Sequence, residues 1–181
     1  MRISLDIGVH QLKKHGEELC GDSVEIVRTG QADLVVVSDG LGSGVKANIL
    51  SRLTAKTAAT MLRMGGHIEE VIDTVAKTLP IDREINAAYS TFSILQIQNN
   101  GKLYLVEYDN PPVFIGNRNS LFAPRREERL IAGKRIREYE FEVDDQDWLV
   151  LTSDGVLNPG TNGHMNASWG WERMASFIEE S

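Results

Sequence analysis

The chain has almost no cysteine and no long hydrophobic run. Only one of its 181 residues is a cysteine, Cys20, which excludes an internal disulfide framework and is typical of a reducing compartment. No apolar stretch is long enough to cross a bilayer, and the N-terminus alternates polar and apolar residues instead of showing a charged-then-apolar signal pattern. These absences predict a cytoplasmic protein without a membrane partner.

Basic charge is also in short supply. The chain has 19 Lys and Arg residues against 26 Asp and Glu, which gives a formal net charge of -7. This balance argues against nucleic acid as the main partner, because nucleic acid attracts cationic side chains. With 41% hydrophobic and 25% charged residues, the chain is typical of one globular domain over residues 1–181, long enough to bury roughly 70% of its unfolded surface.

The most informative stretch runs from Ala32 to Lys46. Leu34 to Val37 form an unbroken apolar run rich in β-branched residues, which predicts a strand buried on both faces. Asp39 and Gly40 follow where this strand must end, before a glycine-rich loop that leads into a long helix. A lone Asp-Gly is most often only a turn. A carboxylate at a strand end, beside exposed backbone carbonyls, can also hold a hard cation.

A second carboxylate is expected beside the first. A strand from Val24 to Thr29 precedes the central strand, and the turn between them lies at Gly30. If the two strands pair as an antiparallel hairpin, Asp22 and Asp39 lie at the same end of it. A shared metal site needs that arrangement.

The other elements follow from periodicity and turn residues. We expect an opening strand from Ile3 to Ile7, a solvated loop from Arg125 to Arg129 and a C-terminal helix from Ser168 to Glu180. Between them we expect a helix that Ser43 or Gly44 caps at its start and that Gly65-Gly66 ends after about residue 62, and then a second helix that ends near residue 79. We also expect strands at 91–98, 103–106, 113–115, 139–143 and 148–152, the last of them buried, with a hairpin turn at Asn99-Asn100-Gly101 between the first two. Two helices after three strands indicate a layered architecture of helices and sheets.

The Asp-Gly arrangement recurs near the C-terminus. Leu-Val-Leu-Thr-Ser-Asp-Gly, ending at Gly155, repeats Val-Val-Val-Ser-Asp-Gly, ending at Gly40. Each is an apolar strand that delivers a carboxylate and then turns on glycine. If Asp22, Asp39 and Asp154 cluster, they do not stay ionised together without cations. Oxygen ligands suit Mg²⁺ or Mn²⁺, whereas zinc would favour His and Cys.

Four blocks of sequence carry a family resemblance. They are Cys-Gly-Asp-Ser at 20–23, Ser-Asp-Gly-Leu-Gly-Ser-Gly at 38–44, Tyr-Ser-Thr-Phe at 89–92 and Thr-Ser-Asp-Gly-Val at 152–156. In order and spacing they resemble the PPM (type 2C) metal-dependent protein serine/threonine phosphatases, specifically the SpoIIE-like and RsbX-like bacterial branch. The resemblance covers nearly the whole chain.

The resemblance implies both a fold and a chemistry. The implied fold is an α+β, four-layer α-β-β-α sandwich of two antiparallel sheets flanked by helices. Two Mn²⁺ or Mg²⁺ ions would lie at one end, with Asp39 bridging both, Asp22 and the main-chain carbonyl of Gly40 completing one site, and Asp154 holding the other. A water between the ions would attack phosphoserine or phosphothreonine on a bacterial regulatory protein of the anti-sigma-factor antagonist type, so no catalytic side chain is required.

One departure from the family pattern leaves an alternative open. The family has a further acidic motif near its C-terminus, and nothing after Gly155 matches it. We therefore expect the last strands and one metal ligand to be missing, which would leave the second metal site incomplete. The alternative function is a non-catalytic phosphoprotein-binding module, or an inactive fragment. A phosphate-cradling loop is a weaker option, because Val45 separates Gly44 from Lys46 and breaks the P-loop order.

Overall fold

A six-stranded antiparallel sheet forms the centre of the protein in the computed structural model, which describes residues 3, 5–78, 81–82, 87–88, 90–118, 120–158 and 170–180. The strand order is β1-β2-β5-β6-β9-β8. The strands are β1 (Asp22–Arg28), β2 (Ala32–Asp39), β5 (Phe92–Gln98), β6 (Lys102–Tyr108), β8 (Arg126–Ile131) and β9 (Lys134–Glu142). Tight turns join most neighbours. Gly101, for example, adopts a φ of 93° between β5 and β6, a conformation that glycine reaches without strain.

Strand β2 is buried on both faces, as its apolar run predicts. Leu34 and Val36 belong to a core on one side of the sheet, and Val35 belongs to a core on the other side. Successive residues of a strand point to opposite faces, so an unbroken run of apolar residues supplies both cores at once.

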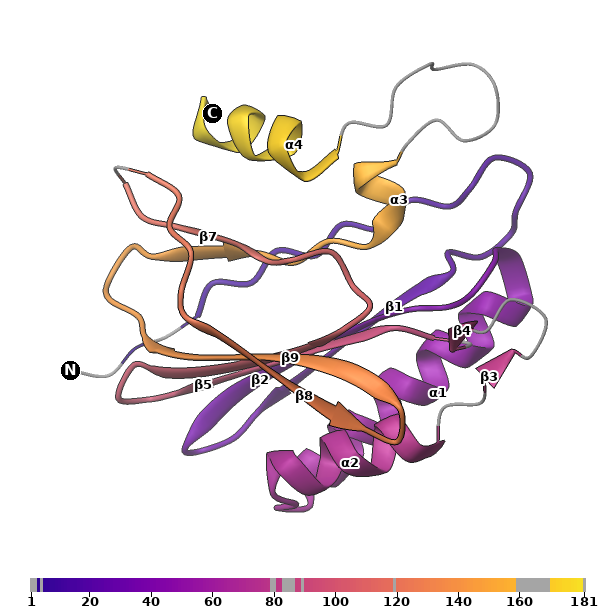
Figure 1. Cartoon of the computed structure of the whole chain (residues 1–181), viewed down its shortest axis with the longest axis horizontal. Coiled ribbons are helices and arrows are strands. Elements are labelled where there is room, and N and C mark those ends of the chain that lie inside the picture. The colour runs from indigo at the N-terminus through magenta and orange to yellow at the C-terminus, as the bar shows by residue number, and fades with distance from the viewer. Residues whose placement is uncertain are drawn as a thin grey trace.

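Two helices cover one face of the sheet (Figure 1). They are α1 (Gly44–Arg63) and α2 (Ile68–Thr78), both in the long connection from β2 to β5. The buried positions of α1 are mostly alanine, serine and threonine, which let the helix lie close to the strands. Gly65, with a φ of 85°, and Gly66, whose N–H donates to Met61 O at 2.9 Å, end α1 as predicted.

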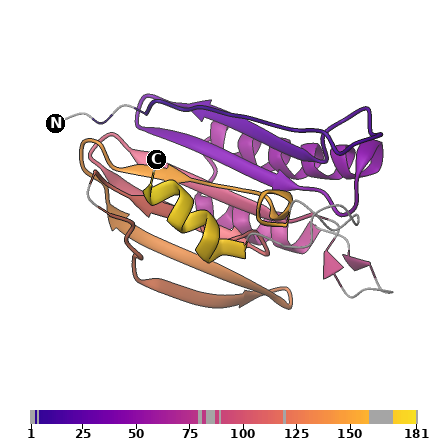
Figure 2. The ribbon, with the colours of Figure 1, turned by 90° about the horizontal axis from the view of Figure 1, so that it is seen from above.

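The opposite face carries a second, smaller sheet and another helix. Strands β7 (Phe114–Gly116) and β10 (Trp148–Val150) pair antiparallel, and α4 (Gly170–Glu179) packs on them through Met174, Ala175 and Ile178. The order from helices to sheet to small sheet to helix is visible in Figure 1, and Figure 2 shows α4 lying across the sheets. The predicted α+β sandwich is confirmed. The remaining described elements are β3 (Ile81–Asp82), β4 (Ala87–Ala88) and α3 (Asp154–Leu157).

Three local predictions are wrong. The described residues between Ile3 and Ile7 form no strand, although Ile3, Leu5 and Ile7 do pack against the core. The segment 125–129, expected to be a loop, mostly belongs to the edge strand β8. β8 lacks an apolar face along most of its length, and cross-strand ion pairs with β9, such as Arg129 with Glu138, take the place of apolar contacts. The last strand, β10, is short and only half-buried.

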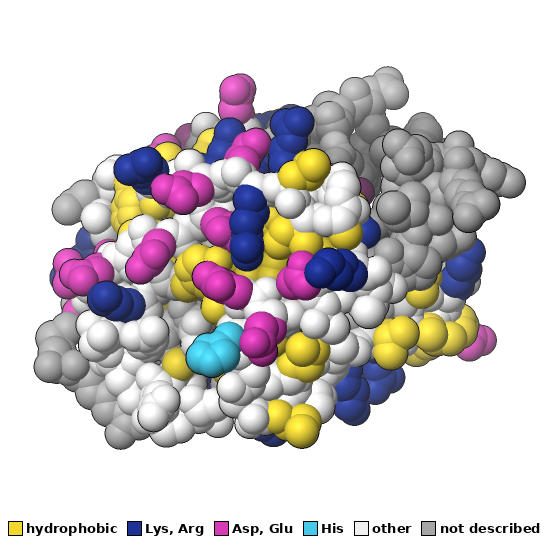
Figure 3. Space-filling model, turned by 60° about the horizontal axis from the view of Figure 1, so that its bottom comes forward, with side chains coloured by type: hydrophobic (Ala, Val, Ile, Leu, Met, Phe, Trp, Pro, Cys, Tyr) yellow, Lys and Arg dark blue, Asp and Glu magenta, His cyan; other side chains and the backbone are white. Residues whose placement is uncertain are grey.

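The helix-covered side of the molecule has a mixed surface. Figure 3 shows this face with acidic and basic side chains interspersed and apolar ones between them. Among the helices that the structure describes, none is long and apolar enough to cross a membrane.

Candidate metal centre

Asp22 and Asp39 lie side by side at one end of the large sheet. Asp22 is the first residue of β1 and Asp39 is the last residue of β2. The two are direct partners in the antiparallel ladder, so their side chains project from the same face, with Cβ atoms about 5 Å apart in a pair of this kind. The predicted hairpin geometry is confirmed.

Asp154 reaches the same place from the far end of the chain. It follows β10 as the first residue of α3, and it lies close enough to Asp39 to raise the pKa of that carboxyl. Ser153, immediately before it, donates from Oγ to Asp22 Oδ2 at 2.9 Å across 131 positions of sequence. The structure therefore brings together the three carboxylates that the sequence analysis singled out.

The three carboxylates of the cluster affect one another's ionisation. Burial, and then the charges of Asp22 and Asp154, raise the pKa of Asp39 from 3.8 to about 8. At neutral pH the proton on Asp39 relieves the repulsion between the three groups. A bound cation would relieve it in the same way and would displace that proton.

Gly40 is required by a close approach of two backbones. A Cβ at this position would lie 2.0 Å from the main-chain oxygen of Ala47 in α1. The Gly40 N–H donates to Gly21 O at 3.3 Å. The first turn of α1 therefore packs directly on the loop that follows Asp39, and no larger residue fits there.

The glycine loop is tied to the segment before β1. Ser43, expected to cap α1, makes no capping bond with its side chain and instead donates to Glu17 Oε1 at 2.7 Å. Gln11 Nε2 donates to Asp22 O at 3.0 Å. Asn48 of α1 donates to Cys20 O at 2.8 Å. No periodic pattern predicts these contacts, because they are polar, irregular and distant along the chain.

The main-chain support of Asp39 comes from Ser90 and Thr91, two residues for which the sequence pattern predicts no individual role. Asp39 O accepts from Thr91 N and from Ser90 Oγ, both at 2.9 Å. Ser90 also contacts Ser38 Oγ at 2.6 Å. The Tyr-Ser-Thr-Phe block at 89–92 contains both donors, so this motif is the sequence signal that points to Ser90 and Thr91. Tyr89 lies outside the described residues.

The residues at this site fit a hard divalent cation. All the donors that we predict are oxygens, from Asp22, Asp39, Asp154 and the Gly40 carbonyl, which suits Mg²⁺ or Mn²⁺. Thr152, two residues before Asp154, has a buried hydroxyl without a hydrogen-bond partner. In the described part of the chain, no three His, Cys, Asp or Glu side chains already form a group that could hold a metal ion. The carboxylates would therefore have to turn towards an ion as it binds.

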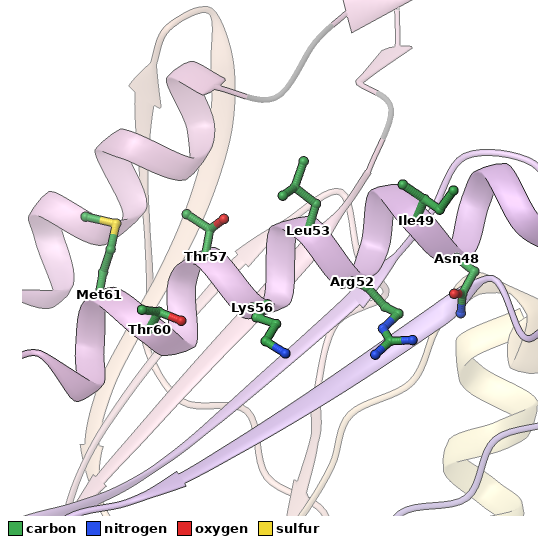
Figure 4. Close-up of a pocket in the computed structure, with 8 residues that line it drawn as sticks. All are labelled: Asn48, Ile49, Arg52, Leu53, Lys56, Thr57, Thr60 and Met61. Carbon is green, nitrogen blue, oxygen red and sulfur yellow. The ribbon is translucent and has the colours of Figure 1, made fainter.

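A separate hollow of about 590 Å³ lies on the outer face of α1. Figure 4 shows Ile49 and Leu53 pointing to one side of the helix, and Arg52 and Lys56 to the other. All of the lining residues come from α1, and none is a predicted metal ligand: Asn48, Ile49, Arg52, Leu53, Lys56, Thr57, Thr60 and Met61. We find no convergence of acidic groups there, so the hollow is not part of the metal centre.

Solved structures with the same fold are phosphatase domains of the PP2C type. The PP2C phosphatase domain with a fragment of the regulatory domain of SpoIIE from Bacillus subtilis has a TM-score of 0.75 at 20% identity, covering 95% of this chain and 51% of that one. RsbX in complex with magnesium has a TM-score of 0.64 at 20% identity, covering 94% of this chain and 84% of that one. The RsbU and RsbW domains of a Mycobacterium tuberculosis protein give 0.69 at 16% identity, covering 93% and 48%.

These likenesses establish the fold class, and a family model establishes the family. The model for stage II sporulation protein E (SpoIIE) matches residues 30–180. The chain therefore belongs to the SpoIIE family. It spans about half the length of the SpoIIE structure from Bacillus subtilis. None of the curated proteins matches the chain.

Proposed function

We propose that this domain is a metal-dependent protein phosphatase that hydrolyses phosphoserine or phosphothreonine on a phosphorylated regulatory protein. The observation that carries the proposal is the meeting of Asp22, Asp39 and Asp154 at one sheet end, in a chain of the SpoIIE family. The partner that we propose is of the anti-sigma-factor antagonist type, and the compartment is the cytoplasm.

The predicted ligands would hold Mn²⁺ or Mg²⁺. Asp39 would contact both ions, Asp22 and the Gly40 carbonyl would complete one site, and Asp154 would serve the other. When bound, such a pair of ions supplies an activated water and stabilises negative charge during phosphoryl transfer. RsbX, which shares the fold, has been solved with magnesium, and this supports the choice of a hard cation.

The chain's own residues prepare the site for this chemistry. Asp39 holds a proton at neutral pH because its pKa is raised to about 8, and it would have to lose that proton to serve as a metal ligand. The hydroxyl of Ser153 orients Asp22. The contact between Gly40 and α1 fixes the backbone that carries the carbonyl ligand. No serine or cysteine nucleophile is needed, and Cys20 is half-buried with Sγ donating to Leu12 O.

The second candidate function is phosphoprotein binding without hydrolysis. One observation favours it: the described side chains do not form a ready-made group of three His, Cys, Asp or Glu ligands. A domain of this kind would bind one ion, or none, and would release no phosphate.

Calorimetry and hydrolysis in the same samples separate the two functions. Mn²⁺ is titrated into the wild type and into Asp39→Asn, which removes the charge at nearly constant shape, and release of p-nitrophenol from its phosphate ester is followed. We expect saturable binding and turnover in the wild type, both abolished by EDTA and both strongly reduced by the substitution. Binding without turnover would favour the binding module. Absence of Mn²⁺ binding to the wild type would contradict the proposed metal centre.

A further inference from the structure

Two buried pairs of serines lie beneath the predicted metal ligands. Ser38 precedes Asp39 on β2, and its hydroxyl lies 2.6 Å from that of Ser90. Ser23 follows Asp22 on β1, and its hydroxyl lies 2.8 Å from that of Ser51 in α1. Ser23 and Ser38 are themselves partners in the ladder. They point to the helix-covered face, opposite to the aspartates, because side chains alternate along a strand.

Only one of the two pairs touches the main chain of a predicted ligand. Ser90 Oγ donates to Asp39 O at 2.9 Å and lies 3.2 Å from Thr91 O, and Ser38 Oγ donates to Thr91 O at 2.7 Å. The other pair makes a different bond, from Ser51 Oγ to Asn48 O at 3.1 Å within α1. The Ser38–Ser90 pair therefore clamps the end of β2 to the start of β5, whereas the Ser23–Ser51 pair only joins β1 to α1.

The clamp continues into a buried polar network. The Thr91 hydroxyl donates to Asn110 Oδ1, and Asn110 Nδ2 donates to Ser93 Oγ at 2.8 Å. Arg137 donates to Asn110 O and pairs with Glu107, whose side chain is fully buried. The residues that hold Asp39 are thus themselves fixed by bonds to β6, β9 and the turn after β6.

Stability alone does not account for the Ser38–Ser90 pair. Both residues are at most 1% exposed, and Ser38 follows three valines in a strand that otherwise supplies the core. Apolar side chains at these two positions would extend the core, whereas the two hydroxyls donate their protons to the main-chain oxygens of Asp39 and Thr91. A pair of hydroxyls at this position is better explained by what it orients.

We propose that Ser90, with Ser38, is a positioning residue for the metal centre: it fixes the main chain of Asp39 so that the carboxylate and the following Gly40 carbonyl face the ion together. The inference rests on the proposed function, because it assigns a role at the same site. Residues that hold metal ligands in place typically change affinity about 10- to 100-fold when they are removed.

The test compares Ser90→Ala with Ser23→Ala by Mn²⁺ calorimetry and by urea unfolding in EDTA. The two changes are matched, because each removes one buried hydroxyl and leaves the other serine of the pair with a carbonyl to which it donates. Ser38 still donates to Thr91 O, and Ser51 still donates to Asn48 O. We expect Ser90→Ala to weaken Mn²⁺ binding about tenfold and Ser23→Ala to leave it within about twofold. Both variants should lose a similar, small amount of stability.

Two further variants keep the inference falsifiable. Ser90→Thr retains the hydroxyl and should restore most of the affinity. The double variant Ser38→Ala/Ser90→Ala also removes the donor to Thr91 O, so it should lose more stability than Ser90→Ala and still bind Mn²⁺ about tenfold more weakly than the wild type. If Ser90→Ala and Ser23→Ala weaken binding equally, or if neither does, the positioning role is wrong while the proposed function stands. A wild type that binds no Mn²⁺ overturns both.

Discussion

The two Asp-Gly strand ends are nearly identical as sequences and differ in three dimensions. The first, at Asp39, ends an eight-residue strand inside the large sheet and leads into a 20-residue helix. The second, at Asp154, follows a three-residue strand of the small sheet and begins a four-residue helix. The strand that ends at Asp39 packs against the core on both faces. The strand that precedes Asp154 is short and half-buried.

The polar groups before each aspartate also differ. Ser38 is fully buried, and its hydroxyl has two partners. Its counterpart before Asp154 is Ser153, which is half-buried and donates to Asp22 Oδ2, but Thr152, one residue earlier and 9% exposed, has a hydroxyl without a partner. The first end is thus a completed structure. The second has an unmet hydrogen-bonding capacity next to a predicted ligand, as expected of a site that is completed only when a water or another ligand is bound. The same sequence motif can therefore be fully hydrogen-bonded in one part of a structure and only partly hydrogen-bonded in another.

The largest predicted effect is the loss of stability in Gly40→Ala, compared with Gly155→Ala. In Gly40→Ala the added Cβ would overlap the main-chain oxygen of Ala47, which cannot retreat without moving α1, whereas a Cβ at Gly155 meets nothing within 4 Å. We expect Gly40→Ala to lose about 3 kcal/mol or more of unfolding free energy, and Gly155→Ala to change it by less than about 1 kcal/mol. Urea unfolding followed by circular dichroism measures both. Equal effects would show that the two ends are equally constrained.

The next effect is on metal affinity. Asp39 interacts with both other carboxylates, so Asp39→Asn should weaken Mn²⁺ binding by about 100-fold or more. Asp154→Asn should weaken Mn²⁺ binding only about tenfold, because it leaves the Asp22 and Asp39 oxygens in place. Calorimetry at pH 7.5 gives both values. A larger loss from Asp154→Asn would mean that the second strand end, not the first, carries the main ligand.

The smallest effect separates the two buried hydroxyls. Ser38→Ala removes a bonded hydroxyl and should destabilise the protein by about 1 kcal/mol. Thr152→Val removes an unbonded hydroxyl at almost constant shape and should leave the stability unchanged or raise it by up to about 1 kcal/mol. Thermal unfolding in EDTA would detect the opposite signs. A stability loss in both variants would indicate that Thr152 has a partner in solution.

Prediction from the sequence succeeded where the relevant interactions were local or periodic. The run Leu34–Val37, the glycines at 65 and 66, and the turn before Gly101 each determined an element correctly. Pairing of Asp22 with Asp39 also followed, because a short hairpin fixes its own register. The prediction of a loop at 125–129 is wrong, because β8 is held by ion pairs with β9, and such pairs leave no hydrophobic periodicity in the sequence.

The sequence by itself determined the central strand, the helices that follow it and the choice of Asp22, Asp39 and Asp154 as candidate ligands. Only the tertiary structure decided that Asp154 meets Asp22 and Asp39, that Ser90 supports Asp39, and that Gly40 is required by the approach of α1. The physical reason is that hairpins and helices are specified by residues a few positions apart. A contact across 131 positions, such as that between Ser153 and Asp22, depends on how the sheets and helices pack together.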